Sequence, residues 1–435
     1  ATGGLIRTTG AYPLIMGANQ NENVTITSGG HLLLNTTTDY ADANSDDLQI
    51  YGTGDTGMSI TSGSSSYGSI YFGDSTSGSA RNAGILRYGH SGDSMEFWTA
   101  EGRRLVLDSN GRLLLGQNSA DTDIGSQLQV VGDTYAEAGI LQSRISADQY
   151  GPALDFLKTR NTSWGSHTIV QDDDQLGRIY FRGDDGNDYG NAGALIMGSV
   201  DGTPGSDDMP GRLTFHTSGD GSVSVTERMR LDSAGRLLIG STANNPIWGV
   251  SAAFQVEGTT GNTSAINLIR NSNDGSAPYF TFGKSRGTSD GSSTIVQNND
   301  GLGHITWTAA DGTDLNSSCA SISAAIDGTP GSNDTPGRLV FSTTADGASG
   351  TTERLRITSG GAVQLNADTG SAYFSVGAAQ DFKWYHDAGG PTIFSDTANQ
   401  GLKLAIKDLN ITEYTGNTSF GSFDTSGQIL SLIHI

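Results

Sequence analysis

The hydrophobic and polar positions of the chain alternate in short runs, and turn residues bound each run. β-Branched and aromatic residues dominate these runs, as is typical of strands. Examples lie at 68–72, 177–181, 213–215, 303–307 and 339–341. Asp-Gly pairs such as Asp201-Gly202 separate them, at intervals of roughly 10–20 residues. Since no segment has the apolar spacing of a convincing amphipathic helix, the pattern predicts an all-β fold.

One strand-turn-strand pattern recurs along the chain. In the copy at 229–240, Leu231 ends the first strand, and a Ser-Ala-Gly turn leads to Leu237 in the second. The glycine of the turn supplies the positive φ that a tight hairpin needs. Because an isolated hairpin is only marginally stable, each copy needs neighbours to pack against. The predicted hairpins lie at 24–35, 105–116, 229–240 and 355–366.

A long internal repeat contains two of these hairpins. Residues 151–235 align with 277–361 at a constant offset of 126 without a gap, and 42 of the 85 positions are identical. Such a period indicates tandem structural modules, so we expect tandem β-hairpin or β-sandwich-like repeats. The predicted domains are an N-terminal strand or hairpin segment at 1–40, repeat modules at 41–118, 119–244 and 245–368, and a truncated C-terminal β module at 369–429.

Composition and charge exclude several classes of protein. Glycine makes up 62 of the 435 residues, but it has no three-residue period, which excludes collagen. No apolar run approaches the ~18 residues of a membrane helix, so we expect no membrane insertion. The net charge of −22 repels phosphate backbones, so we expect no nucleic-acid partner. The lone cysteine, Cys319, cannot form an internal disulfide and leaves the redox compartment open.

Two of the predicted hairpins share the longer motif Glu-Arg-Met/Leu-Arg-Leu/Ile-x-Ser-x-Gly. One copy runs from Glu227 to Gly240 and the other from Glu353 to Asn366. This motif resembles the tail-fibre proteins of marine tailed bacteriophages. The copy at 103–116 keeps Arg104 but has Arg103 in place of the glutamate. The run from Asp381 to Asp387 looks like a second module of such fibres, with Ala388 where glycine is usual. Together these patterns cover most of residues 24–390.

The resemblance implies an elongated homotrimer that recognises a receptor near its distal end. We therefore predict an extracellular, non-catalytic structural and adhesive protein of the virion tail. Its predicted partners are further copies of itself, other virion tail proteins, and a host cell-surface glycan or protein, with a glycan as the first expectation. Weak contacts at several sites would sum to avidity. The alternatives are a bacterial surface adhesin of similar β-repeats and a polysaccharide-depolymerising tailspike.

The two ends of the sequence indicate a partial chain. The first residue is Ala1 rather than methionine. Fibres of this kind often end in a self-cleaving intramolecular chaperone, which has no match here. Residues 430–435 equal the translation of a common transposase sequencing adapter. We therefore interpret 430–435 as a non-native tail and the sequence as a truncated metagenomic reading frame.

No catalytic constellation stands out in the sequence. The seven histidines are scattered, and one cysteine cannot make a zinc site. A tailspike glycosidase needs a pair of carboxylates across a sugar, and Asp172, Asp173 and Asp174 could contribute to one. The repeat has Asn298 and Asn299 at two of these positions. We therefore predict a solvated turn.

Calcium is the cofactor that oxygen-rich turns suit. The candidate ligands are Asp185 and Asp188, which recur as Asp311 and Asp314. The twelve-residue loop that ends in a bidentate glutamate is absent. We therefore predict structural turns and no cofactor, with calcium as the alternative.

Aromatic side chains that could stack on a sugar ring are the candidate ligand contacts. Trp164 aligns with Asp290 in the repeat, so the fold does not require an aromatic residue there. Trp307 aligns with Phe181 inside a strand, where we expect a core position. Weaker candidates for ligand binding are Trp384, Tyr385 and His386, for which packing is the first expectation.

Overall fold

The computed structural model of the chain describes residues 12–18, 21–41, 45, 47–366, 373–376, 382–387 and 390–395. In these residues the regular elements are strands and one short 3₁₀ helix at Ser79–Asn82. The prediction of an all-β fold is therefore confirmed. The described part of the chain contains no helix with the length and hydrophobicity that a membrane span needs. The predicted non-native tail at 430–435 lies outside the described residues.

The chain forms two compact units. Unit 1 comprises Ala1–Thr242 and Ala253–Gly258, and unit 2 comprises Ala243–Ala252 and Thr259–Ile435. Trp248 ties the short first segment of unit 2 to the rest of that unit. Its backbone N–H donates to Asn316 Oδ1, and its indole N–H donates to the Asn316 carbonyl, both at 2.6 Å.

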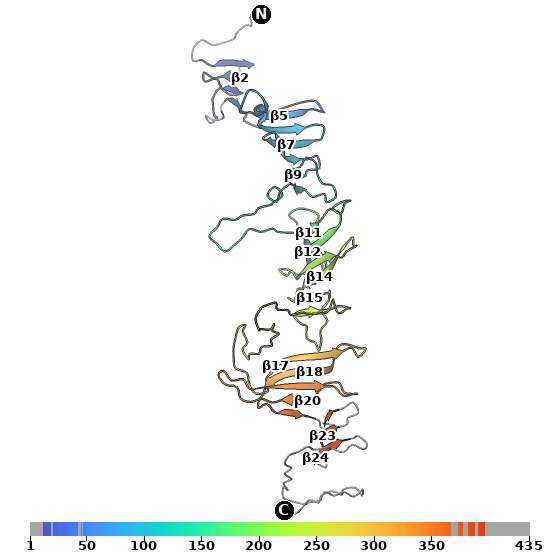
Figure 1. The fold of residues 1–435 in the computed structure, drawn as a ribbon. Helices are drawn as coiled ribbons and strands as arrows, with labels where there is room; N and C mark the ends of the chain where they lie inside the picture. Colours follow the sequence, from blue (N-terminus) through green and yellow to red (C-terminus); the bar gives the residue numbers. More distant parts are fainter. Residues whose placement is uncertain are drawn as a thin grey trace, which may run out of the picture. The chain divides into compact units, whose positions relative to one another are not determined.

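Unit 1 contains three sheets in its described residues, and the strands of each sheet follow one another in chain order (Figure 1). The first sheet has β1 (Leu14–Ala18), β2 (Asn21–Ile26), β3 (Leu32–Leu34) and β4 (Leu48–Ile50). The second has β5 (Tyr67–Phe72), β6 (Gly84–Gly89), β7 (Ser94–Thr99), β8 (Gly102–Leu107), β9 (Leu113–Leu115) and β10 (Leu128–Val130). The third has β11 (Gln175–Arg182), β12 (Ala192–Val200), β13 (Gly211–Ser218), β14 (Val225–Leu231), β15 (Leu237–Ile239) and β16 (Phe254–Val256).

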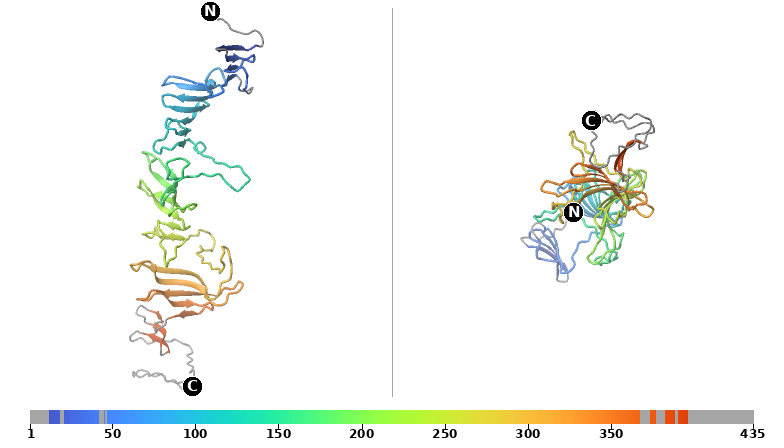
Figure 2. Two further views of the ribbon diagram at one scale, coloured as in Figure 1. Left: turned by 180° about the vertical axis from the view of Figure 1, so that it is seen from behind. Right: turned by 90° about the horizontal axis from the view of Figure 1, so that it is seen from below.

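Unit 2 contains two further sheets in its described residues, again in chain order (Figure 2). The fourth sheet has β17 (Gly301–Ala309), β18 (Ser317–Ile326), β19 (Gly337–Thr343), β20 (Thr352–Ile357) and β21 (Val363–Leu365). The fifth has β22 (Tyr373–Val376), β23 (Phe382–Asp387) and β24 (Gly390–Ser395).

The sheets share one topology, in which an antiparallel meander ends in a hairpin. The predicted hairpins are the pairs β2–β3, β8–β9, β14–β15 and β20–β21, so this prediction is confirmed. In unit 1 a further short strand, β4, β10 or β16, then lies parallel to the second hairpin strand. Two of these parallel strands follow residues 118 and 244, at which the sequence-based modules end. The module limits themselves stay a prediction.

An aspartate holds the hairpin turn of the second sheet. Asp108 Oδ1 accepts two backbone N–H groups of the turn at 2.9 Å, and Asp108 Oδ2 accepts Arg112 Nε at 2.8 Å. Gly111 has a φ of 76°, which suits a residue without a Cβ. Asp232 and Arg236 repeat these contacts in the third sheet. The Ser-x-Gly signal of the sequence therefore marks a real tight turn.

A β-bulge interrupts the pairing at the same place in three sheets. The register shifts lie after Phe97, Phe215 and Phe341. The extra residue on the facing strand is Arg104, Arg228 or Arg354, and its Nε donates to a threonine of the neighbouring strand at 3.4, 3.1 and 3.0 Å, respectively. This contact explains why the motif keeps an arginine at that position.

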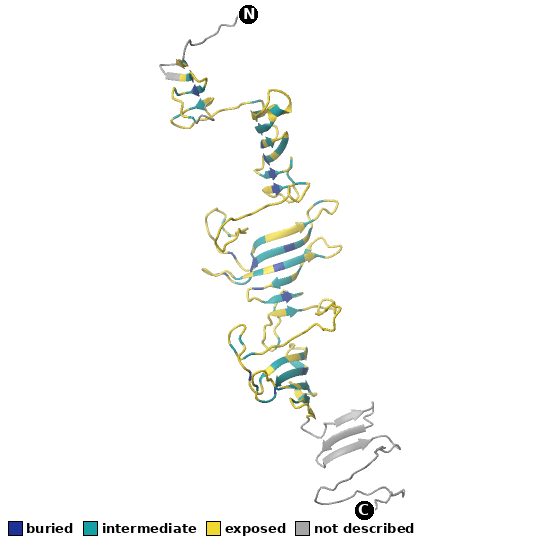
Figure 3. Ribbon diagram, turned by 60° about the vertical axis from the view of Figure 1, so that its left-hand side comes forward, coloured by how far each residue is buried: buried dark blue, intermediate teal, exposed yellow. Residues whose placement is uncertain are grey.

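Few hydrophobic side chains are buried within one chain. The central residue of the second hairpin strand is the most regular of them, since Leu33, Leu114 and Leu238 are each at most 1% exposed. Exposed residues cover the segments between the sheets and parts of the sheets themselves (Figure 3). The chain therefore leaves much of its apolar surface uncovered.

Long irregular segments precede the two repeat sheets. The segment 131–174 runs out from the strands and back again (Figure 1). On its return Phe156 packs over β11 so closely that a Cβ at Gly177 would lie 2.6 Å from the Phe156 Cβ. In the repeat, Phe282 approaches Gly303 in the same way, at 2.7 Å. These two glycines are therefore needed for close approach of a phenylalanine.

Candidate self-association face and candidate binding residues

Each of the larger sheets gathers hydrophobic side chains on one face, which we call its apolar face. Residues paired across neighbouring strands lie on the same face of a sheet. In the third sheet the central row is Ile179, Ile196, Phe215, Met229, Ile239 and Val256. The matching rows are Ile70, Leu86, Phe97, Leu105, Leu115 and Val130 in the second sheet, and Ile305, Ile322, Phe341, Leu355 and Leu365 in the fourth.

The apolar faces are only partly covered by the described part of the same chain, since Phe156 and Phe282 pack over Gly177 and Gly303 at one end of the rows. Phe181 is 53% exposed, and Trp307, at the matching position of the repeat, is 51% exposed. Sequence analysis predicts a core position for Trp307, whereas the structure places it half-exposed on the apolar face. Other exposed members of these faces are Phe72, Phe97, Leu107, Leu128, Leu213, Leu231, Phe254 and Val363. A contiguous apolar surface of this kind marks an interaction site.

The opposite face of each sheet carries polar and charged pairs. On the third sheet Arg230 Nε donates to Glu227 Oε1, and on the fourth Arg356 Nε donates to Glu353 Oε1, both at 2.5 Å. In both copies of the motif, the glutamate therefore pairs with the second arginine of its own strand. This face also holds the buried side chains of Leu114 and Leu238 beside the charged pairs. The two faces therefore suit different neighbours.

Glu96 is the centre of a buried charged cluster on the opposite face of the second sheet. It is 3% exposed. Its Oε2 accepts Arg87 Nε at 2.7 Å and Trp98 Nε1 at 2.9 Å, and its Oε1 accepts an Arg103 guanidinium nitrogen at 2.8 Å. Burial raises the pKa of Glu96, but the hydrogen bonds from Trp98 and Arg87 outweigh it and hold that pKa below its ordinary value.

This cluster explains the departure of the second sheet from the motif. Arg103 lies opposite Trp98, in the position that Glu227 occupies opposite His216 in the third sheet. In the second sheet the acidic partner, Glu96, lies on the strand next to that of Arg103, whereas Glu227 and Arg230 lie on one strand. Sequence reasoning missed Glu96, although the replacement of the motif glutamate by Arg103 was a signal that a new acidic partner was needed.

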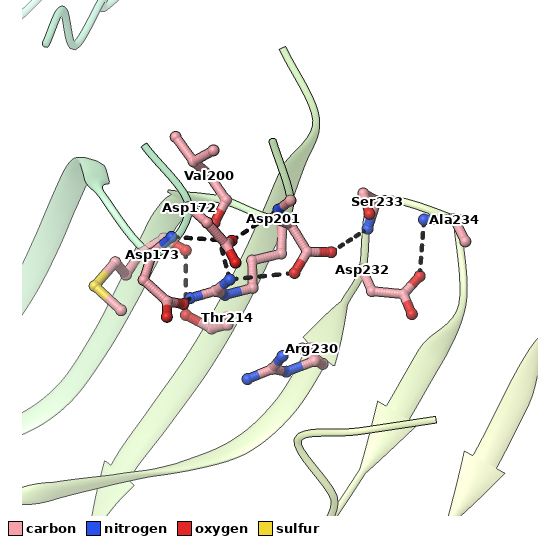
Figure 4. A network of polar contacts seen from close by, with 12 residues as sticks. Asp172, Asp173, Val200, Asp201, Thr214, Arg230, Asp232, Ser233 and Ala234 are labelled. Atoms are coloured by element: carbon pink, nitrogen blue, oxygen red, sulfur yellow. Dashed lines mark hydrogen bonds and ion pairs between the residues drawn. The ribbon is translucent and has the colours of Figure 1, made fainter. Parts of the chain in front are cut away.

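Asp172 and Asp173 bind groups of their own chain in the network shown in Figure 4, and Asp174 pairs with Arg160 at 2.6 Å. Asp172 Oδ1 accepts the Gly202 N–H at 2.7 Å, and Asp173 pairs with Arg212. Arg212 also donates to Asp201, whose second oxygen accepts a backbone N–H from the next hairpin turn at 2.8 Å. These contacts brace the sheet edge.

The repeat shows that this network needs acceptors rather than acids. Asn298 Oδ1 accepts the Gly328 N–H at 3.0 Å, and Asn299 Oδ1 accepts Arg338 at 3.0 Å. Amide oxygens thus replace the carboxylates of Asp172 and Asp173 with the same partners. This substitution favours the predicted turn over a catalytic pair.

The candidate calcium ligands lie in two matching turns. Asp185 Oδ1 accepts two backbone N–H groups, and its Oδ2 accepts Asn191 Nδ2 at 3.0 Å. Asp188 accepts the Gly190 N–H in the same turn. Hydrogen bonds from Asn191 and the backbone hold the pKa of Asp185 below its ordinary value.

The turn of the repeat has the same build. Asp311 Oδ1 accepts two backbone N–H groups, and Asp314 Oδ1 accepts the Asn316 N–H at 2.8 Å. The first turn also contains Asp184, which accepts the Gly186 N–H. The described part of the chain contains no group of three or more acidic, histidine or cysteine side chains placed to hold a metal ion. Structural turns without a cofactor stay the prediction, and calcium stays its alternative.

The aromatic candidates occupy different settings. Trp164 stands in a turn within the segment 131–174 and is 99% exposed. Trp384, Tyr385 and His386 are consecutive residues of β23, opposite Phe374, Tyr373 and Pro391 in its neighbours. A role in ligand binding stays a prediction for all four.

Comparisons with known proteins give limited information. The sequence matches no protein-family model and no curated protein. Among solved structures, the carboxy-terminal domain of the bacteriophage T5 L-shaped tail fibre is similar over 63% of this chain and 100% of that chain, with 14% identity and a TM-score of 0.45. The same domain with its intramolecular chaperone is similar over 64% of this chain and 72% of that chain, with the same identity and TM-score. At a TM-score below 0.5, this likeness does not establish a shared fold family.

Proposed function

We propose that the chain is a structural and adhesive fibre of a bacteriophage tail, and that it works as a homotrimer. The observation that carries the proposal is the only partly covered apolar face, which recurs in the same register in sheets that follow one another along the chain. A single layer of this kind needs a second layer to exclude water from Phe181, Trp307 and their neighbours.

Further copies of the chain are the occupant that best suits these faces. An identical chain carries the same apolar rows at the same spacing, so all of the faces can be covered at once by repeated contacts. The motif at Glu227–Gly240 and Glu353–Asn366 resembles phage tail fibres, which favours three chains over two. The attachment surface would then be the polar outside of the assembly, presented to a host glycan or protein.

A non-catalytic role is the function that the acidic residues support. Asn298 and Asn299 replace Asp172 and Asp173 without loss of partners. The charged groups of the sheets are paired with arginines in the same way, as at Glu96, Glu227 and Glu353. These acids brace strands rather than face each other across an open cleft.

The test is the mass of the purified chain in solution by light scattering, with its shape by negative-stain microscopy. We expect an elongated particle of about three chain masses. In the same preparation, labelled protein should bind cells in a panel of marine bacteria without releasing reducing sugar from their surface polysaccharide. A compact monomer, or release of sugar, would contradict the proposal.

A further inference from the structure

An open pocket of about 400 Å³ lies on the opposite, polar face of the second sheet. This volume falls in the range of small-molecule pockets. Its floor is formed by strands β5 to β9, and its rim by the turns that follow β6, β8 and β9. The lining groups that matter to the argument are Tyr67, Glu96, Arg103, Asp108, Arg112 and Asn118.

The acids of this pocket use most of their acceptor capacity within the chain. Both oxygens of Glu96 are bound by arginine and tryptophan donors. Both oxygens of Asp108 are bound within its hairpin turn. The negative charges of the lining are thus neutralised in place, and they do not repel an anion at close range.

The donors of the pocket, in contrast, are not all used. Arg112 donates through its backbone N–H and Nε, and within the described residues its two terminal nitrogens have no partner. Arg103 uses Nε on Asn118 Oδ1 at 2.7 Å and one terminal nitrogen on Glu96. Its other terminal nitrogen and Asn118 Nδ2 likewise have no partner in the part of the chain that the structure describes. The pocket therefore presents free N–H donors, and a ligand rich in acceptors would match them.

An aromatic wall stands beside these donors. Tyr67 is 51% exposed. Its ring is stacked against the Arg87 guanidinium at 4.1 Å, and this guanidinium also lies 4.3 Å from the ring centroid of Trp98. Because Arg87 is locked to Glu96, the tyrosine ring is held in place before any ligand arrives. A rigid ring next to fixed donors suits the apolar face of a sugar.

The pocket is particular to the second sheet and lies away from the apolar face. At the position of Arg103 the repeat sheets have Glu227 and Glu353, which pair along their own strands. Tyr67, Glu96 and Val106 of the lining belong to the residues that alternate with the apolar row at Ile70, Phe97 and Leu105. Covering the apolar face by another chain would leave this pocket open.

We propose that this pocket binds a carboxylate-bearing sugar unit of a host surface polysaccharide, with the carboxylate on the free arginine donors and the ring against Tyr67. This inference deepens the proposed adhesive function and rests on it. A guanidinium group binds a planar carboxylate through two parallel hydrogen bonds, which gives the pocket a preference for acidic over neutral sugars.

The experiment titrates the full chain with digalacturonic acid and with the neutral disaccharide galactobiose, by calorimetry. We expect the acidic disaccharide to bind at least about tenfold more tightly, which corresponds to ~1.4 kcal/mol. Asn118→Asp keeps the acceptor for Arg103 Nε but adds a negative charge, so the variant should lose binding of digalacturonic acid. Equal binding of both disaccharides, binding of neither, or an unaffected Asn118→Asp variant would overturn the inference.

The chain supplies a matched control for the arginine. Arg112→Gln removes the two terminal guanidinium nitrogens of Arg112. This change should weaken binding of digalacturonic acid at least about fivefold. Arg236→Gln changes the same turn residue in the third sheet and should leave binding unchanged. If both variants weaken binding equally, the effect is general and the pocket is not the site. The pocket lies within one chain, so its binding of sugar is measured independently of trimer assembly and of cell adhesion. A failure of the pocket proposal can therefore be distinguished from a failure of the proposed function.

Discussion

Glu96 is the residue on which the second sheet depends most. Its buried carboxylate binds Arg87, Arg103 and Trp98, so its removal leaves two arginines without their charged partner. We expect Glu96→Gln to lower the local stability of β6–β8 by about 2–3 kcal/mol, less than for a fully buried pair because the arginines are partly exposed. Hydrogen exchange of the peptides that span 84–107 measures this local free energy.

Glu227→Gln is the control for this prediction. Glu227 makes the same kind of pair with Arg230 but is more exposed than Glu96. We expect a loss of at most ~1 kcal/mol in the third sheet. Equal losses in the two sheets would contradict the view that burial makes the Glu96 cluster special.

Acid sensitivity follows from the same carboxylates. Desolvation raises the pKa values of Glu96, Asp108 and Asp232, but hydrogen bonds from neighbouring arginines, backbone N–H groups and, at Glu96, Trp98 outweigh it and lower all three. A lowered folded-state pKa stabilises the fold above the unfolded value, near pH 4, and this stability is lost as the pH falls. The melting temperature should therefore fall most steeply below about pH 4, after a smaller decline that starts near pH 6.5, because burial lowers the pKa of His216.

The variant Asp232→Asn tests this assignment. An amide still accepts the backbone N–H groups of the turn but does not titrate. We expect a smaller loss of stability between pH 5 and pH 3 than in the unaltered chain. An equal loss of stability between pH 5 and pH 3 in the variant and in the unaltered chain would contradict the assignment.

At the scale of the elements, the hairpins could be predicted because their determinants are local. In the second sheet, for example, Gly111 with its positive φ and Asp108, which binds the turn, lie within the same short turn. The parallel strands could not be predicted in the same way, because β10 pairs with β9 across an irregular loop. Their three-residue length carries no periodic pattern. The bulge at Arg228 was likewise hidden, since a register shift depends on the facing strand.

Gln129 is the side chain that fixes the parallel strand of the second sheet. Its Oε1 accepts the Asp121 N–H at 2.8 Å and Gln117 Nε2 at 2.6 Å, and its Nε2 donates to the Asp121 and Ser126 carbonyls at 3.0 and 3.1 Å. Gln49 makes similar contacts in the first sheet. A buried amide with four partners thus closes the loop between β9 and β10.

Gln129→Met keeps the length of this side chain and removes its amide. We expect the loop at 116–127 to lose about 1–3 kcal/mol of local stability, because two carbonyls and a backbone N–H lose a partner. Hydrogen exchange should rise in this loop and in β10, while β5 to β7 keep their protection. Unchanged exchange in the loop would show that the backbone pairing of β10 suffices.

At the scale of the whole molecule, the candidate site could be predicted only in part. The alternation of the sequence reveals that each strand has an apolar side, and Trp307 reads as a core residue on that ground. The register between strands decides whether the apolar sides of neighbouring strands lie on the same face of the sheet. This register cannot be inferred from the local sequence of one strand. The structure supplies the register, and with it the observation that a large part of each face, rather than single residues, is exposed.

Phe181 and Tyr180 allow the assembly to be tested with adjacent residues of one strand. Phe181 lies on the apolar face, and Tyr180 lies on the opposite face beside Arg178 and Arg182. Burying a phenylalanine side chain is worth about 1.5–3 kcal/mol, and a trimer contains three copies of each contact. We therefore expect Phe181→Glu to shift the chain to monomers at micromolar concentration, as measured by light scattering over a dilution series.

Tyr180→Glu introduces the same charge one residue away and should leave the trimer intact. Trp307→Glu should repeat the effect of Phe181→Glu, because the two positions are equivalent in the repeat. If Tyr180→Glu dissociates the assembly while Phe181→Glu does not, then the opposite face is the contact surface. The proposed arrangement of the trimer would then be wrong, whereas calorimetry with digalacturonic acid would still decide separately whether the pocket at Tyr67 and Arg112 binds an acidic sugar.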